Sequence, residues 1–260
     1  MSYYPILNAP RANGWTTLSN FPPNNWEPSR LKQQFVNVTW ASDGMWLTKN
    51  LGVIAPGTFH TVHAGDVTDI VPEESLPLLS LSLEPLPTES TSLPSLDFKR
   101  TSVPAWRASL GLSTPCAQTS YQGELDFFPS QGTLLTFGPF LQFGEDVQNY
   151  LLLLNLEKSP LKRFAELEVY DAAELTPRGR FTICNNKVNC ISLDELDFKE
   201  DDLPLFICRG MAAIPLYFSY AKNGSYLSLE HTHPPASLVV HGKRWEAQKL
   251  LKQRWFDMVL

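Results

Sequence analysis

The stretch Ile214–Glu230, with the sequence IPLYFSYAKNGSYLSLE, decides the fold class of this chain. Apolar and small polar side chains alternate on both sides of Asn223-Gly224, as they do in strands with one face toward a core. Asn-Gly accepts the positive φ angles that a two-residue hairpin turn requires. The sequence therefore predicts an antiparallel hairpin with strands at Ile214–Tyr220 and Tyr226–Glu230.

The same alternation recurs along most of the chain. It predicts a strand from Phe35 to Trp40 and a hairpin over Thr58–Val71 that turns at Ala64-Gly65-Asp66. Further strands are predicted at Met45–Thr48, Leu79–Leu83, Trp106–Leu110, Thr133–Phe137, Tyr150–Leu156, Leu167–Tyr170, Phe181–Cys184, Val188–Leu193 and Leu205–Cys208. Many short strands indicate an antiparallel β-sandwich or jelly-roll-like fold.

Three segments describe the expected organisation. Residues 1–30 are rich in proline and predict an extended N-terminal arm, because proline blocks regular helix. Residues 31–241 are expected to form one β-sandwich domain, with a long loop rich in proline, serine and threonine at 84–97. Residues 242–260 predict one C-terminal α-helix packed on that domain, because apolar side chains share one broad arc of a helical wheel.

Composition limits the classes of function. The 260 residues are 43% hydrophobic and 18% charged, which is enough apolar material for a core. A net charge of −6 argues against a nucleic-acid binder and against attraction to anionic membranes. The longest apolar run, Leu151–Leu154, is too short to span a bilayer. Four cysteines and a start without a secretory signal lead us to expect a cytoplasmic, reduced protein.

Aromatic side chains make up 12% of the chain, and several tryptophans fall in turn-rich segments. Exposed rings can stack on sugar faces or bind a protein partner, although each tryptophan could instead fill the core. The sequence contains no phosphate loop, dinucleotide fingerprint, nucleophile elbow or zinc pair of cysteines. The leading hypothesis is a non-catalytic recognition module for a glycan or a protein. Its candidate ligand-binding residues are Trp15, Trp26, Trp46, Trp106, Tyr121 and Glu124.

The histidines support an alternative hypothesis, a metal-dependent enzyme or metal-binding β protein. His231 and His233 project from the same face of an extended strand, so their imidazoles could bind one divalent transition metal such as zinc. The third ligand would be His241 or one histidine of the pair His60 and His63. His231 and His233 could equally be structural histidines bonded to backbone carbonyls. A third hypothesis is a structural subunit of an assembly or a homo-oligomer, held together by the N-terminal arm and the C-terminal helix.

The segment His231–Pro234 resembles the His-x-His-Pro core of JAMM-type metalloproteases. The resemblance covers four residues, and the Ser-x-x-Asp of that family does not follow, because Ser237 precedes Leu238-Val239-Val240. The activity of that family is therefore not carried over to this chain.

Overall fold

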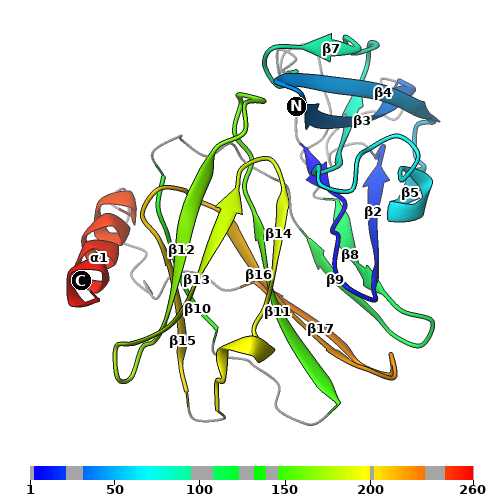
Figure 1. Cartoon of the computed structure of the whole chain (residues 1–260). Helices are drawn as coiled ribbons and strands as arrows, with labels where there is room; N and C mark the ends of the chain where they lie inside the picture. Colours follow the sequence, from blue (N-terminus) through cyan, green and yellow to red (C-terminus); the bar gives the residue numbers. More distant parts are fainter. Residues whose placement is uncertain are drawn as a thin grey trace. The chain divides into compact units, whose positions relative to one another are not determined.

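The computed structural model describes residues 3–21, 32–94, 108–122, 132–138, 146–199, 202–231 and 244–259. The described chain is mostly β, its sheets are antiparallel, and it ends in one α-helix, which confirms the predicted fold class. The residues divide into two compact units (Figure 1). Unit 1 comprises Met1–Phe127, Leu156–Arg163 and Asn185–Val188. Unit 2 comprises Phe128–Asn155, Phe164–Cys184 and Asn189–Leu260.

The described residues of unit 1 form two antiparallel sheets and include the short 3-10 helix η2 (Ala64–Asp66). The first sheet has the strand order β1-β6-β3-β4-β7. Its strands are β1 (Tyr4–Pro5), β3 (Gln34–Ser42), β4 (Met45–Ile54), β6 (Leu78–Ser82) and β7 (Glu89–Ser90). The second sheet has the order β5-β2-β8-β9. Its strands are β2 (Asn13–Ser19), β5 (Phe59–His63), β8 (Ser109–Ser113) and β9 (Gln118–Gln122).

The core of unit 1 receives side chains from both of its sheets. Val36, Val38 and Trp40 share one face of β3, as their alternation predicts, and all three are buried. They belong to one cluster with Leu18 of β2 and Val62 of β5. Unit 1 is therefore a two-layer sandwich whose apolar interior lies between the sheets.

The residues expected to form an extended arm contain two strands of this sandwich. Tyr4 of β1 pairs with Leu79 of β6, and β2 lies between β5 and β8. The reason is apolar burial, because the side chains of Tyr3, Tyr4, Ile6 and Leu7 are buried. The prediction that residues 31–241 form a single domain stays a prediction, because a domain is defined by its ability to fold independently.

The hairpin expected over Thr58–Val71 is wrong in its second half. Strand β5 ends at His63, and the chain then enters η2 and a series of turns. Val67 N donates to Ala64 O (3.2 Å) and Val71 N to Val67 O (2.9 Å), so these residues coil locally. Both valines are buried in the core, which explains their apolar character without a strand.

The described residues of unit 2 also form two antiparallel sheets, with the orders β10-β15-β12-β13 and β14-β11-β16-β17. The strands of the first are β10 (Leu134–Phe137), β12 (Phe164–Asp171), β13 (Thr176–Cys184) and β15 (Pro204–Cys208). Those of the second are β11 (Val147–Leu154), β14 (Val188–Ser192), β16 (Ile214–Ala221) and β17 (Leu227–His231). A short 3-10 helix, η3 (Asp194–Leu196), follows β14. Side chains of both sheets share one buried cluster, so unit 2 is a second sandwich.

Strands β16 and β17 form the hairpin predicted from the alternating pattern. Its turn differs from the predicted two-residue type, because Ala221 N donates to Tyr226 O (3.1 Å) and four residues lie between them. Of the Asn-Gly pair, only Gly224 has a positive φ, of 75°. The Asn223 side chain instead accepts from Ser225 N at 3.0 Å, which stabilises the longer turn.

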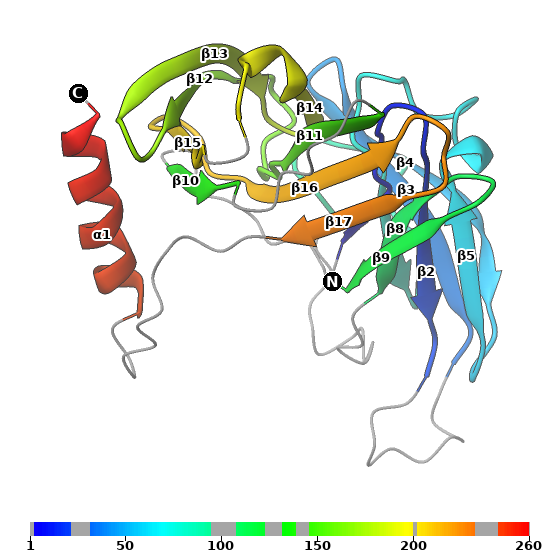
Figure 2. The same ribbon diagram turned by 90° about the horizontal axis from the view of Figure 1, so that it is seen from below.

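The C-terminal helix α1 (Arg244–Met258) packs against the sheet that contains β10 and β15, on the side away from β11 and β16 (Figures 1 and 2). Phe256 and Val259 are buried in a cluster with Leu135 and Ile207. Lys252 Nζ donates to Thr133 O at 3.0 Å, which ties the helix to the start of β10. No helix in the described part of the chain is long and apolar enough to cross a membrane.

Candidate functional site

Two of the tryptophans predicted to bind a ligand are buried in unit 1. Trp15 is 7% exposed and Trp46 is 1% exposed. A Cβ added at Gly111 would lie 2.8 Å from the ring of Trp15, so this glycine makes room for the indole. The indole nitrogen of Trp46 donates to Lys158 O at 2.8 Å, within unit 1. These contacts explain both tryptophans as packing residues.

The other predicted ligand-binding residues provide no assembled site. Tyr121 lies in β9 and is half-buried. Trp26, Trp106 and Glu124 lie outside the described residues. The structure therefore does not bring the predicted aromatic set together, and its role in binding stays a prediction.

The predicted metal ligands are described only in part. His231 is the last residue of β17, is half-buried and stands opposite Leu216 in the ladder. His233 and His241 lie outside the described residues. Among the residues that the structure describes, no three His, Cys, Asp or Glu side chains are placed to hold a metal ion. Zinc binding thus stays a prediction.

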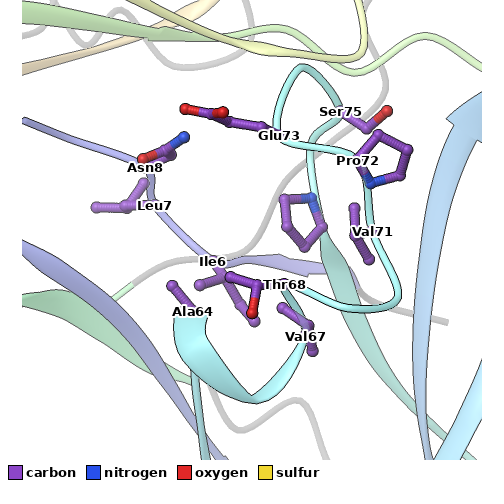
Figure 3. A pocket seen from close by; sticks show the side chains of 11 residues that line it. Ile6, Leu7, Asn8, Ala64, Val67, Thr68, Val71, Pro72, Glu73 and Ser75 are labelled. Atoms are coloured by element: carbon purple, nitrogen blue, oxygen red, sulfur yellow. The ribbon is translucent and has the colours of Figure 1, made fainter.

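A pocket in unit 1 is a candidate site within the described residues. It has a volume of about 350 Å³ and lies between the N-terminal segment and the turns that follow β5 (Figure 3). Its lining residues are Ile6, Leu7, Asn8, Ala64, Val67, Thr68, Val71, Pro72, Glu73, Ser75 and Pro77. The aliphatic side chains of Ile6, Leu7, Val67 and Val71 are buried and form its floor, while Asn8, Thr68 and Glu73 are exposed at its rim.

Backbone hydrogen bonds fix the walls of this pocket. Ile6 N donates to Pro77 O (3.0 Å), which continues the pairing of β1 with β6 and holds the N-terminal segment in place. Asp66 accepts from His63 N (2.8 Å), and this bond closes the first turn after β5. A side chain at Gly14 of β2 would collide with the carbonyl oxygen of Leu7, so glycine permits the close approach of the two segments. The pocket is preformed by the fold.

The rim of the pocket carries one carboxylate. Figure 3 shows the side chains of Glu73 and Asn8 on the same side of the opening, above the aliphatic floor. The Ser75 hydroxyl is directed away, because it donates to Ala41 O at 3.0 Å. The Thr68 hydroxyl donates to Gly65 O at 3.0 Å. A ligand in this pocket would therefore meet aliphatic carbon below and the oxygens of Glu73 and Asn8 above.

Sequence reasoning missed this pocket. Its walls come from three segments, 6–8, 64–68 and 71–77, which meet only after β1 pairs with β6 and β5 with β2. The one available signal was Asp66, whose spacing from His63 fits a capped turn rather than a hairpin.

Comparisons with known proteins do not assign this chain to a class of protein. No family model matches the chain, and neither the curated proteins nor the solved structures compared with it include a match. The pocket and its lining are therefore the features of the described residues that indicate a function.

Proposed function

We propose that this protein is a non-catalytic recognition module, and that its unit 1 pocket binds a partner protein by taking up an aliphatic side chain. The observation that carries the proposal is the pocket, a cavity of about 350 Å³ with a buried aliphatic floor. Ligand pockets in proteins have volumes from roughly 300 Å³ upward and are lined mainly by apolar side chains with a few polar groups. The pocket of unit 1 has that composition.

The lining favours binding over catalysis. Nucleophilic catalysis requires a hydroxyl or thiol beside a base, and general acid–base catalysis requires a positioned titratable group at the reacting atom. Here the hydroxyls of Thr68 and Ser75 donate to backbone carbonyls. Glu73 is the one titratable side chain among the lining residues. A single exposed carboxylate above aliphatic carbon suits recognition.

The same lining favours a protein partner over a glycan. Sugar rings bind best on aromatic faces, and the lining residues include no aromatic side chain. Aliphatic walls built from Ile6, Val67 and Val71 complement an aliphatic side chain such as leucine, isoleucine or valine. We therefore take a segment of a protein as the occupant.

The pocket alone provides modest affinity. Burying one leucine side chain contributes about 1.5–3 kcal/mol. A dissociation constant of 1 mM already corresponds to about 4 kcal/mol, so residues that flank the anchor must add contacts. A multivalent selection raises the apparent affinity and can detect binding of this strength.

The test is a library of random linear peptides displayed on phage and selected on the full chain. Thr68→Trp blocks the pocket, because Thr68 is exposed at its rim. Thr58→Trp is a matched control, since Thr58 is also exposed and its hydroxyl also donates to a carbonyl three residues earlier, Ala55 O at 2.7 Å. Thr58 stands at the opposite end of β5 from η2.

We expect enriched peptides to share an aliphatic residue, to bind wild type and Thr58→Trp equally, and to lose binding to Thr68→Trp. Circular dichroism and thermal melting establish that both variants are folded. Peptides that bind all three proteins equally, or a selection that enriches no sequence, would overturn the proposal.

A further inference from the structure

We infer that the pocket selects a segment in which lysine or arginine stands close to the aliphatic anchor, so that the cation meets Glu73 at the rim. This inference rests on the proposed function and adds the charge of the partner to it. Two features of the structure support it: the position of the Glu73 carboxylate over the pocket and the charge of the segment that builds the wall.

The Glu73 carboxylate is available to a ligand. Glu73 lines the pocket and is exposed, and within the described residues no hydrogen bond or ion pair is recorded for its oxygens. Asn8 also lines the pocket, and Figure 3 shows its amide and the Glu73 carboxylate on the same side of the opening. An ammonium or guanidinium group placed there could donate to the carboxylate and to the Asn8 amide oxygen together.

The surroundings of Glu73 add to its negative charge. Asp69 and Glu74 are exposed in the same segment, and the stretch from His60 to Leu79 contains no lysine or arginine. In the described part of the chain, Arg11, the nearest basic residue to Asn8 in sequence, forms no recorded ion pair with these acids. A net charge of −6 also steers a cationic segment toward the protein.

The geometry of an extended peptide matches this arrangement. Residues at positions i and i+2 project from the same side, about 6–7 Å apart. An aliphatic residue can therefore enter the pocket while the residue two positions away lies over its rim. Lysine and arginine suit the second position, because their aliphatic stems pack on apolar surface while the charged end stays in water.

The test measures binding of three defined peptides to the full chain by methyl NMR. The probes are acetylated, amidated pentapeptides with the sequences Gly-Leu-Gly-Lys-Gly, Gly-Leu-Gly-Gln-Gly and Gly-Leu-Gly-Glu-Gly. The methyl groups of Ile6, Val67 and Val71 report occupancy, since all three line the pocket. A single anchor worth about 1.5–3 kcal/mol corresponds to a dissociation constant of roughly 6–80 mM, so the titration extends to about 100 mM peptide.

We expect the lysine peptide to bind up to about fivefold more tightly than the glutamine peptide, the range that exposed ion pairs supply, and the glutamate peptide to bind most weakly. Glu73→Gln removes the difference between the lysine and glutamine peptides, and so does high salt. Glu89→Gln is the control and leaves the difference intact. Glu89 is exposed in β7, at the sheet edge opposite β1.

The outcomes distinguish a failure of the charge preference from a failure of the proposed recognition function. Equal binding of the lysine and glutamine peptides, with shifts at the pocket methyls, would overturn the charge preference and leave the recognition function standing. No methyl shift with any peptide would overturn both. A lysine preference that survives Glu73→Gln would place the cation elsewhere and refute the inference.

Discussion

Removing Arg163 is predicted to destabilise the protein more than neutralising its partner, Glu157. The Glu157 carboxylate accepts from Arg163 Nε at 3.2 and 3.4 Å, and Arg163 Nη2 donates to it as well. Asn185 Nδ2 adds a further bond at 3.2 Å. The two charged side chains differ in burial, since that of Glu157 is 7% exposed and that of Arg163 is 32% exposed.

This difference in burial determines how much stability each variant is expected to lose. Arg163→Ala leaves a buried carboxylate without its cation, and breaking a buried pair in this way costs about 3–5 kcal/mol. We expect about 3 kcal/mol, because Asn185 still donates to the carboxylate. Glu157→Gln leaves Arg163, which reaches water, and keeps an acceptor in place, so its cost is about 1–2 kcal/mol.

Thermal melting measures these effects. For a chain of this size, 1 kcal/mol shifts the melting temperature by about 2–4 °C, so Arg163→Ala should lower it by about 6–12 °C. The double variant Glu157→Gln/Arg163→Ala should melt above Arg163→Ala, because the uncompensated charge is gone. Arg180→Ala is the control and should melt near wild type, since Arg180 and Glu166 pair at 3.5 Å with side chains 69% and 58% exposed. The reasoning fails if Arg163→Ala has the same melting temperature as Arg180→Ala, or if the double variant has a lower melting temperature than Arg163→Ala.

Two further perturbations test the local structure. Gly14→Ala should shift the methyl NMR signals of Ile6 and Leu7 and lower the melting temperature, because the added Cβ collides with the Leu7 carbonyl; an unchanged spectrum would contradict the assigned contact. Burial, together with the neighbouring Tyr220, raises the pKa of Tyr150 to about 12. The neutral form is favoured in the folded state, so stability is lost as the pH rises from about 10, the usual pKa of tyrosine, to about 12. Tyr150→Phe should lose less stability over that pH range than wild type, and parallel pH profiles would refute the effect.

Many of the strands and the helix were predictable from sequence because side-chain period is a local property, whereas β1, β2, β7 and β9 lie where no strand was expected. Alternation over Ile214–Tyr220 and the apolar arc of the terminal helix each depend on neighbours within a few residues. The division into two units depends on pairing between distant segments and was not predictable in this way. Leu156–Arg163 and Asn185–Val188 belong to unit 1, although the strands beside them belong to unit 2.

The burial of the tryptophans was also beyond local reasoning. Trp15 stands in the expected N-terminal arm and Trp46 in a strand predicted directly after a turn, so both were candidates for exposed rings. Their rings are enclosed by residues distant in sequence, Gly111 beside Trp15 and Lys158 beside Trp46. A tryptophan in the sequence indicates a large apolar side chain that will contact other groups, but it does not indicate whether those groups belong to the same molecule or to a ligand.

The same distinction explains why the pocket is a better candidate than the aromatic set. Its floor is held by the bond from Ile6 N to Pro77 O and by the close approach of Leu7 to Gly14, so a ligand does not have to order these segments. Preformed sites avoid the entropic cost of ordering, and that saving matters most where the anchor itself contributes little. Burial of one aliphatic side chain contributes little free energy, and the preformed walls cost little to order, so the pocket suits reversible recognition of a short segment. Glu73 would add selectivity for charge more than affinity.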